Sequence, residues 1–267
     1  YLRGRQTYVE FRDATSKYRK VKQGVPQGGV LSPLLFNLYM SKMPKPPGNI
    51  KLVSYADDSN ALNSGPKIEP ICQELNIYLD ILDDWFISRN LFISPAKSTA
   101  TLFTTAPGEV SVQLDIKIKY TLVPTVKQPK FLGVTYDNLF KFGYHAKKVK
   151  KKLTSKNNVL KALAGTTWGK EKESITNTYK AIGQSLLNYA CPVWAPALAD
   201  THWDSLQAAQ NTALKIATGY HKMAGTGHVH NETKMMPVKS HCEMLSKQYL
   251  LSTQLESHPV RVDLTAP

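Results

Sequence analysis

Cysteine, long apolar runs and acidic residues are all scarce in this 267-residue chain. The three cysteines, Cys72, Cys191 and Cys242, lie far apart without CxxC spacing. This argues against a disulfide framework or a zinc site and favours a reducing, intracellular compartment. No apolar run reaches the roughly 18 residues that span a bilayer, so no membrane is expected among the partners. The chain opens without an initiator Met or a signal-peptide pattern, and we expect it to be a piece of a longer protein.

Basic residues dominate the charge. Lysine and arginine number 34 against 20 acidic residues, which gives a formal net charge of +14 and a pI near 9.5. Such a balance favours a polyanionic partner, most simply nucleic acid, although a solvated basic surface is the alternative. Between residues 138 and 170 the sequence holds nine lysines and no acid. The hydrophobic share of 42% is enough to bury a core in one large or two smaller domains.

Residues 1–140 mix strand and helix patterns. The sequence predicts a hairpin from 7–11 and 17–21, and a buried helix over 34–40 that Ser32 caps and Pro33 starts. Strands at 51–55 and 60–62 are expected around a tight turn that holds Asp57 and Asp58, followed by a helix over 69–87. Further strands are predicted at 91–93, 99–103, 131–134 and within the alternating stretch 110–123.

From residue 141 the pattern becomes helical. Val149, Leu153, Leu160 and Leu163 form one apolar stripe that lysines surround, and helices are expected near 174–188 and 204–218. The predicted fold class is therefore α+β, with a mixed domain over 1–140 and a basic helical domain over 141–267. The four tryptophans, Trp85, Trp168, Trp194 and Trp203, are expected in the core.

The pair Asp57-Asp58 is the leading candidate for chemistry. Adjacent carboxylates flanked by strands are costly unless something neutralises them, and Mg²⁺ prefers such oxygen ligands. Two-metal phosphoryl transfer uses a site of this kind. An exposed Asp-Asp turn is the plain alternative. His228, His230 and His241 with Cys242 match no zinc spacing, and we assign them no metal.

Four segments in order carry a family resemblance. The run from Gln23 to Phe36 (QGVPQGGVLSPLLF) and the later YADD at 55–58 are similar to motifs B and C of reverse transcriptases from non-LTR, LINE-type retrotransposons, the Jockey-like group in particular. The stretch 91–98 resembles motif D, and 131–134 resembles motif E, the primer grip. The resemblance implies a partial right-hand palm, built on an antiparallel sheet with packed helices, followed by a helical thumb.

The resemblance also implies roles for individual residues. Asp57 and Asp58 are expected to hold Mg²⁺, two ions in the complete enzyme, with Mn²⁺ as an alternative. Gln27, Gly28 and Tyr55 are expected to contact template and nucleotide, and Lys97 to assist departure of pyrophosphate. The remaining expected contacts are the primer grip, Phe131, Leu132 and Gly133, and the thumb lysines that meet the nucleic-acid backbone, Lys147, Lys148, Lys151 and Lys152.

The expected reaction is RNA-templated DNA synthesis, with an RNA template, a DNA primer or RNA–DNA hybrid, and dNTPs as partners. Nothing before Gly24 resembles motif A, which supplies a third carboxylate in the family, and the fingers and an endonuclease domain are missing too. We therefore expect little activity from this chain alone.

Two alternatives stay open, a decayed or domesticated nucleic-acid-binding remnant and an intron- or retron-type reverse transcriptase. Nuclear action is expected from the resemblance, and the lysines at 147–152 serve as an import signal or as a thumb face.

Overall fold

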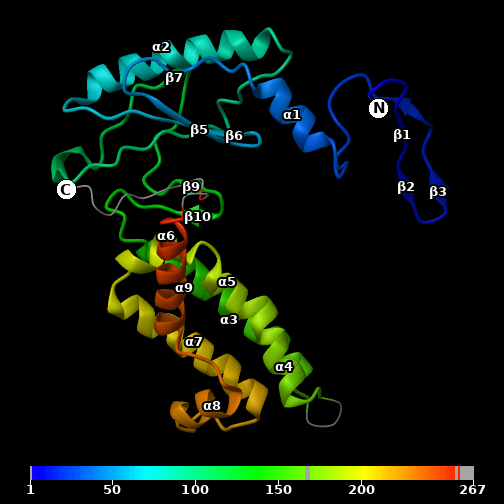
Figure 1. Ribbon diagram of the computed structural model, residues 1–267, viewed down its shortest axis with the longest axis vertical. Helices are drawn as coiled ribbons and strands as arrows, with labels where there is room; N and C mark the ends of the chain where they lie inside the picture. Colours follow the sequence, from blue (N-terminus) through cyan, green and yellow to red (C-terminus); the bar gives the residue numbers. More distant parts are fainter. Residues whose placement is uncertain (1, 166–168, 256–257, 259–267) are drawn as a thin grey trace. The chain divides into compact units, whose positions relative to one another are not determined.

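The computed structural model describes residues 2–165, 169–255 and 258, so the prediction for Trp168 lies outside the described residues. The chain divides into two compact units. Unit 1 comprises residues 1–100 and 113–124, and unit 2 comprises 101–112 and 125–267. Helices and short antiparallel strand pairs both occur (Figure 1), which confirms the α+β class. The strands of the described residues form separate two-stranded antiparallel pairs.

Unit 1 begins with a long hairpin made of two short strand pairs. β1 pairs with β4 and β2 with β3, all antiparallel. The chain reverses at Arg12 and Asp13, where Arg12 has a φ of 54°. The predicted hairpin is therefore present, but its turn is shorter than expected because residues 14 and 15 continue as a strand. The bounds are β1 Gln6–Thr7, β2 Glu10–Phe11, β3 Ala14–Thr15 and β4 Arg19–Lys20.

The predicted helix after the glycine-rich loop is present as α1, Ser32–Met40, with Pro33 in its first turn. Two details of the prediction are wrong. Leu31, not Ser32, precedes the helix, because the Ser32 hydroxyl donates back to the Pro26 carbonyl oxygen at 2.5 Å and closes the loop. The helix is also largely exposed: the side chains of Leu34 and Leu38 are 65% and 69% accessible. The apolar run 34–40 is therefore not buried by other residues of the described chain.

A hairpin and one long helix form the small core of unit 1. β5, Lys51–Tyr55, and β6, Asp58–Leu62, pair in antiparallel register with Tyr55 opposite Asp58. α2, Ile68–Ile87, runs beside this hairpin (Figure 1) and places Tyr78 and Leu82 against it. The Tyr78 hydroxyl donates to the Pro44 carbonyl oxygen at 2.9 Å. The first predicted strand and the helix are confirmed almost to the residue. The second strand begins two residues earlier than predicted, so Asp58 lies in β6 and not in the turn, because it pairs with Tyr55.

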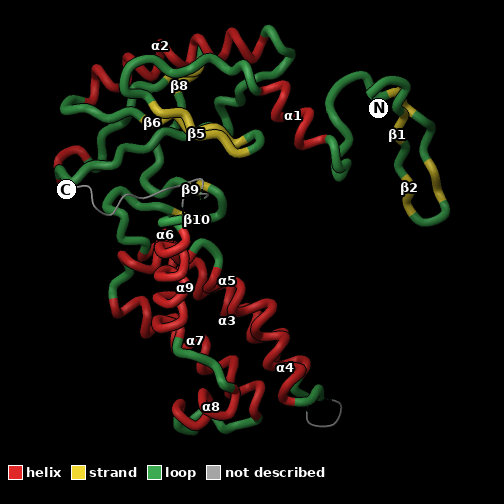
Figure 2. The backbone as a smooth tube through the Cα atoms, viewed as in Figure 1, coloured by secondary structure: helices red, strands yellow, loops and turns green. Residues whose placement is uncertain are grey.

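The segment that follows α2 is mostly irregular (Figure 2). The strands predicted at 91–93 and 99–103 are wrong, since only Ala100 makes a bridge there, with its N–H donating to the Pro124 carbonyl oxygen. Pro95 and the turn around it interrupt the pairing. The alternation expected over 110–123 does appear in burial, at Leu114, Ile116 and Ile118. The short elements here are η1 Pro107–Glu109, β7 Lys117–Ile118 and β8 Thr121–Leu122.

A tight hairpin lies in unit 2 where one strand was predicted. β9, Lys130–Phe131, pairs with β10, Val134–Thr135, across a two-residue turn. Leu132 and Gly133 occupy that turn with φ values of 43° and 86°. The apolar run 131–134 therefore does not continue straight, because positive φ at two successive residues reverses the chain as hairpin turns require.

The rest of unit 2 is helical (Figure 2), as the sequence predicts. The lysine-rich helix α3, Gly143–Leu163, buries Val149, Leu153 and Leu160. The helices expected near 174–188 and 204–218 are present, the first with a wider π turn, while three further helices at 191–194, 226–233 and 238–252 were not predicted. The remaining bounds are α4 Lys172–Tyr179, η2 Lys180–Gln184, α5 Ser185–Asn188, α6 Cys191–Trp194, η3 Ala195–Ala197, α7 Asp200–Thr218, α8 Thr226–Thr233 and α9 Val238–Ser252.

The core of unit 2 is continuous and aromatic. Trp194 is fully buried, its ring 5.7 Å from that of Trp203, and its indole N–H donates to the Tyr189 carbonyl oxygen at 3.0 Å. These two tryptophans lie in the core as predicted, whereas Trp85 of unit 1 is half-buried, with the Arg89 guanidinium 4.4 Å from its ring. All three cysteines are free and buried.

Candidate functional site: the β5–β6 turn and the basic helix α3

The β5–β6 turn presents the two carboxylates. Ala56 and Asp57 form the turn, with Ala56 at a φ of 52°, and Asp58 is the first residue of β6. The hairpin beneath is held by its ladder and by the Ser54 and Ser59 hydroxyls, 2.9 Å apart. Asp57, Asp58 and Tyr55 are all exposed. Neither carboxylate makes a hydrogen bond or an ion pair within the described chain, so both are open to a ligand.

A two-ion site needs more donors than this turn holds. Among residues 2–165, 169–255 and 258, no group of three or more His, Cys, Asp and Glu side chains is placed to hold a metal ion. Two adjacent carboxylates leave two hard cations short of ligands, because such ions sit among several oxygens. The donor set described here therefore does not fit a complete two-metal centre, and it supplies at most part of one.

The loop before α1 is shaped by glycine. Gly24 and Gly28 both have a φ of 79°, a conformation that side chains other than glycine rarely adopt. The Gly29 N–H donates to the Pro26 carbonyl oxygen at 3.3 Å, which makes residues 26–29 a turn. Gln27 and Gly28 are exposed at its tip. No hydrogen bond among the described residues joins this loop to the Asp57-Asp58 turn, so their predicted cooperation stays a prediction.

Lys97 lies in a turn rather than at a strand end. The Lys97 N–H donates to the Ser94 carbonyl oxygen at 3.1 Å, and the Ser98 hydroxyl donates to the same oxygen at 2.9 Å. The Lys97 side chain is exposed, and its ammonium group pairs with no described residue. The position leaves it free to meet an anion, and its assigned role stays a prediction.

Of the predicted primer-grip residues, Phe131 ends β9, and Leu132 and Gly133 form the β9–β10 turn. Tyr189, which follows α5, contacts this turn. The Tyr189 hydroxyl donates to the Leu132 carbonyl oxygen at 2.6 Å. A Cβ on Gly133 would come within 3.1 Å of the Tyr189 ring, so glycine lets the ring lie close to the turn. Phe131 is half-buried, while Leu132 and Gly133 are exposed. Tyr189 was not predicted, because no local pattern links residues that are 57 positions apart.

The lysines of α3 are exposed and without acidic partners. Lys147, Lys148, Lys151 and Lys152 all face solvent. The Lys148 ammonium group donates to the Thr135 hydroxyl at 3.2 Å, and that of Lys147 lies 5.6 Å from the centre of the Tyr144 ring. In the described part of the chain no lysine of α3 forms a salt bridge; the four that exist involve Lys117, Lys119, Lys172 and Lys239. The positive charge of α3 is thus available to a polyanion.

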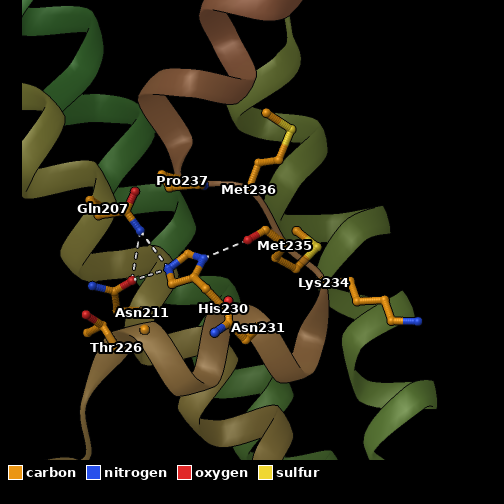
Figure 3. A pocket seen from close by; sticks show the side chains of 10 residues that line it. Gln207, Asn211, Thr226, His230, Asn231, Lys234, Met235, Met236 and Pro237 are labelled. Atoms are coloured by element: carbon orange, nitrogen blue, oxygen red, sulfur yellow. Dashed lines mark hydrogen bonds between the residues drawn. The ribbon is translucent and has the colours of Figure 1, made fainter.

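A pocket beside α7 and α8 holds none of the predicted site residues. It has a volume of about 660 Å³. His230 is its hub (Figure 3): Nδ1 lies 2.8 Å from the Met235 carbonyl oxygen, and Nε2 lies 3.1 Å from the Gln207 amide nitrogen. The Gln207 amide oxygen accepts from the Val238 N–H. These hydrogen bonds pair the polar groups with one another and link the 234–237 segment to α7. His230 therefore has a structural role.

Comparison with known proteins identifies the class. The model of the family described as reverse transcriptase (RNA-dependent DNA polymerase) matches residues 3–136, half of the chain. The segments similar to motifs B, C, D and E all lie within that match. The chain therefore belongs to the reverse transcriptase family.

Its curated relatives are retrotransposon proteins. The chain is 29% identical to a probable RNA-directed DNA polymerase from transposon X-element of Drosophila melanogaster, over 98% of this chain and 29% of that protein. It is 26% identical to the corresponding protein of transposon BS, over 97% and 29%. It is 25% identical to the RNA-directed DNA polymerase from mobile element jockey of Drosophila funebris, over 97% and 28%. The non-LTR resemblance is confirmed. The chain spans less than a third of the length of these relatives, and no solved structure gives a significant match.

Proposed function

We propose that this chain supplies part of the catalytic domain of a non-LTR retrotransposon reverse transcriptase. The observation that carries the proposal is the exposed, unpartnered Asp57-Asp58 pair on a hairpin turn within a family match over residues 3–136. In the complete enzyme, a primer 3′-hydroxyl attacks the α-phosphate of a dNTP opposite an RNA template, and pyrophosphate leaves. The relatives' printed names give RNA-directed DNA polymerase activity, and we extend it here as a proposal.

The described residues take the following parts in this proposal. Asp57 and Asp58 contribute oxygen ligands for Mg²⁺ or Mn²⁺, and further ligands come from outside the described donor set. Lys97 neutralises or protonates the departing pyrophosphate. Gln27, Gly28 and Tyr55 meet template and nucleotide, and the turn of Phe131, Leu132 and Gly133 steadies the primer end. On this proposal residues 1–140 are a partial palm, and residues 141–267 are a helical, basic thumb and the C-terminal region.

A chimeric polymerase tests the catalytic role. This chain replaces the aligned stretch of the X-element protein, which retains its own remaining sequence, and primer extension on an RNA template is measured with magnesium. We expect template-dependent DNA synthesis that falls by at least about a hundredfold in Asp57→Asn or Asp58→Asn, since each removes a charge from the reacting centre. Asp115→Asn, at an exposed carboxylate paired with Lys117, is the matched control and should leave synthesis unchanged. Full activity of Asp57→Asn would overturn the proposal.

The isolated 267-residue chain should extend primers poorly or not at all. Its described donor set offers no third carboxylate near the β5–β6 turn, and a two-metal reaction depends on a fuller set. Robust synthesis by the purified chain with magnesium would contradict this expectation.

Nucleic-acid binding without catalysis is the second candidate. The unpaired lysines of α3 favour it, because they bind phosphates whether or not the palm is complete. Binding by an inactive chimera, in which the substitutions at Asp57 and Asp58 change nothing, would support this candidate. The relatives described above are all retrotransposon proteins, so an intron- or retron-type enzyme is no longer favoured.

The site of action follows from the same proposal. No described helix is both long and apolar enough to cross a membrane. We propose that the complete protein acts on nuclear DNA. A fluorescent fusion of this chain, compared with one in which the lysines at 147–152 are replaced by glutamine, tests whether that cluster directs import.

A further inference from the structure

The chain contains two Ser-Pro dipeptides, which the structure places in opposite surroundings. Ser32-Pro33 lies at the start of α1, where only 6% of Ser32 is exposed and its hydroxyl donates to the Pro26 carbonyl oxygen. In Ser94-Pro95 the serine is exposed, and its hydroxyl makes no hydrogen bond to a residue that the structure describes. Of the two serines, Ser94 alone therefore presents a free hydroxyl group to an incoming reagent.

The backbone around Ser94 suits the substrate of a protein kinase. Residues 91–94 form neither helix nor strand, and residues 95–97 form a turn in which the Lys97 N–H donates to the Ser94 carbonyl oxygen at 3.1 Å. Pro95 disfavours the helical conformation for the residue before it. A kinase places the substrate hydroxyl against a catalytic aspartate, and a segment outside helix and strand reaches that position without unfolding.

A lysine completes the pattern around Ser94. Residues 94–97 have the order Ser-Pro-Ala-Lys, and the Lys97 ammonium group is exposed and pairs with no described residue. Kinases discriminate among substrates by the charges around the acceptor hydroxyl. Proline-directed kinases of the cyclin-dependent class accept serine followed by proline and, two residues further on, a basic side chain. The other dipeptide lacks this charge, because Leu35 stands three residues after Ser32.

We propose that Ser94 is phosphorylated by a proline-directed protein kinase, and that the phosphate then pairs with the Lys97 ammonium group. The Ser94 hydroxyl oxygen bonds to the γ-phosphorus of ATP, and the bond from that phosphorus to the β–γ bridging oxygen breaks. ADP leaves, and the hydroxyl proton passes to the kinase's catalytic aspartate. The product carries about 1.5–2 negative charges at pH 7. Ser94 and Lys97 are the two ends of one turn, so the phosphate and the ammonium group can meet without a change of backbone.

The pairing has a consequence for polymerisation, and this consequence rests on the proposed function. There, Lys97 neutralises or protonates the departing pyrophosphate. A phosphate on Ser94 competes for the same cation, so the modified enzyme should synthesise DNA more slowly. The modification itself depends only on the exposed turn.

Phosphorylation of the purified full chain tests the site. The chain is incubated with ATP and a cyclin-dependent kinase bound to its cyclin, and mass spectrometry locates the phosphate. We expect it on Ser94, with modification of Ser32 at least about tenfold slower because the start of α1 must first open. Lys97→Gln should slow the reaction, whereas Lys67→Gln makes the same charge change at an exposed position outside the turn and should not. No phosphate on Ser94, or equal rates at Ser32 and Ser94, would overturn the proposal.

Phosphorus NMR tests the pairing with Lys97. The second pKa of a phosphoserine is about 6, and a nearby cation lowers it because it favours the doubly charged form. We expect the pKa of the Ser94 phosphate to be about 0.2–0.7 units lower in the unaltered chain than in Lys97→Gln, the size of an exposed ion pair. An equal phosphate pKa in the two chains would overturn the pairing.

The chimeric polymerase separates this inference from the proposed function. Ser94→Asp should lower synthesis about two- to fivefold relative to the uncharged Ser94→Asn, and Lys97→Gln should abolish that difference. A chimera that makes no DNA overturns the proposed function, and the two measurements on the isolated chain still decide the site. Equal synthesis by Ser94→Asp and Ser94→Asn overturns the consequence for polymerisation alone.

Discussion

Unit 2 contains a large, continuous hydrophobic core, whereas unit 1 contains only a small one. In unit 2 the core includes Leu153, Leu160 and Trp194, each fully buried. In unit 1 the corresponding cluster is small, built on Ile50, Tyr78 and Leu82. Val30, two residues before α1, is 94% exposed. The difference teaches that the stability of the chain resides mainly in the helical unit, while the predicted chemistry lies in the unit with less of a core.

The largest expected effect comes from the centre of the unit 2 core. Trp194→Ala removes a fully buried ring and its hydrogen bond, and should lower the free energy of unfolding by about 3–5 kcal/mol. Urea unfolding followed by far-UV circular dichroism measures it. The control is Leu38→Ala on the exposed face of α1, which should change stability by less than about 0.5 kcal/mol. A comparable loss in both variants would contradict the comparison of the two units.

The β9–β10 turn comes next in expected size. Gly133→Ala places a Cβ at positive φ and within 3.1 Å of the Tyr189 ring, and should cost about 1–2 kcal/mol. Tyr189→Phe removes the hydroxyl that donates to Leu132 and should cost about 1 kcal/mol. Gly108→Ala, in open space within unit 2 and at an ordinary φ, is the control for the first change. Thermal unfolding of the four proteins checks the order.

A pH effect of smaller size is expected from His145. Burial lowers the pKa of His145 below its ordinary value of 6.5, with Lys152 and Lys148 adding to the shift. The folded state then binds fewer protons than the unfolded state, so this contribution to stability is full above pH 6.5 and is lost as the pH falls from there toward the lowered pKa. Protonation also competes with the Thr135 N–H, which donates to Nδ1 at 3.2 Å.

The test compares the urea midpoint at pH 8 and pH 5.5. The unaltered chain should lose more stability on acidification than His145→Gln does. His241, whose pKa burial also lowers, contributes equally to both proteins and cancels in the difference. Identical pH dependence in the two proteins would show that His145 is not the group responsible.

The smallest effect on stability is expected at the candidate catalytic pair. Asp57→Asn and Asp58→Asn alter exposed carboxylates that no described residue contacts by a hydrogen bond or an ion pair, so each should change the unfolding free energy by less than about 0.5 kcal/mol. Together with a large loss of synthesis in the chimera, that result assigns the pair to function alone. A loss above 1 kcal/mol would mean that the turn depends on these carboxylates.

The sequence predicts well the elements whose pattern is local. Strand β5, helix α2 and helix α3 follow from residue spacing alone, and the turn between β5 and β6 follows from the strands around it. The candidate residues Asp57 and Asp58 were identified from a short contiguous motif, which is also a local pattern. Their exposure agrees with a role in binding, but spacing could not show which donors surround them.

The errors arise where tertiary contacts decide. The run at 131–134 is apolar enough for a strand, yet Tyr189 holds its middle in a turn. Ser32 has the composition of a helix cap, but the Pro26 carbonyl oxygen takes its hydroxyl. In α3, Asn157 interrupts an apolar stripe, which the sequence does show. Only the structure shows that its buried Oδ1 has no donor among the described residues.

The unpaired lysines of α3 have a further consequence for folding. Lys147 and Lys151 are one helical turn apart, as are Lys148 and Lys152, and each such like-charge pair weakens a helix by about 0.2–0.5 kcal/mol. A polyanion that binds the folded chain removes this repulsion and shifts the equilibrium toward the native state by mass action. A nucleic-acid duplex is such a polyanion, and the thermal midpoint of the chain should therefore rise when a duplex that binds it is added.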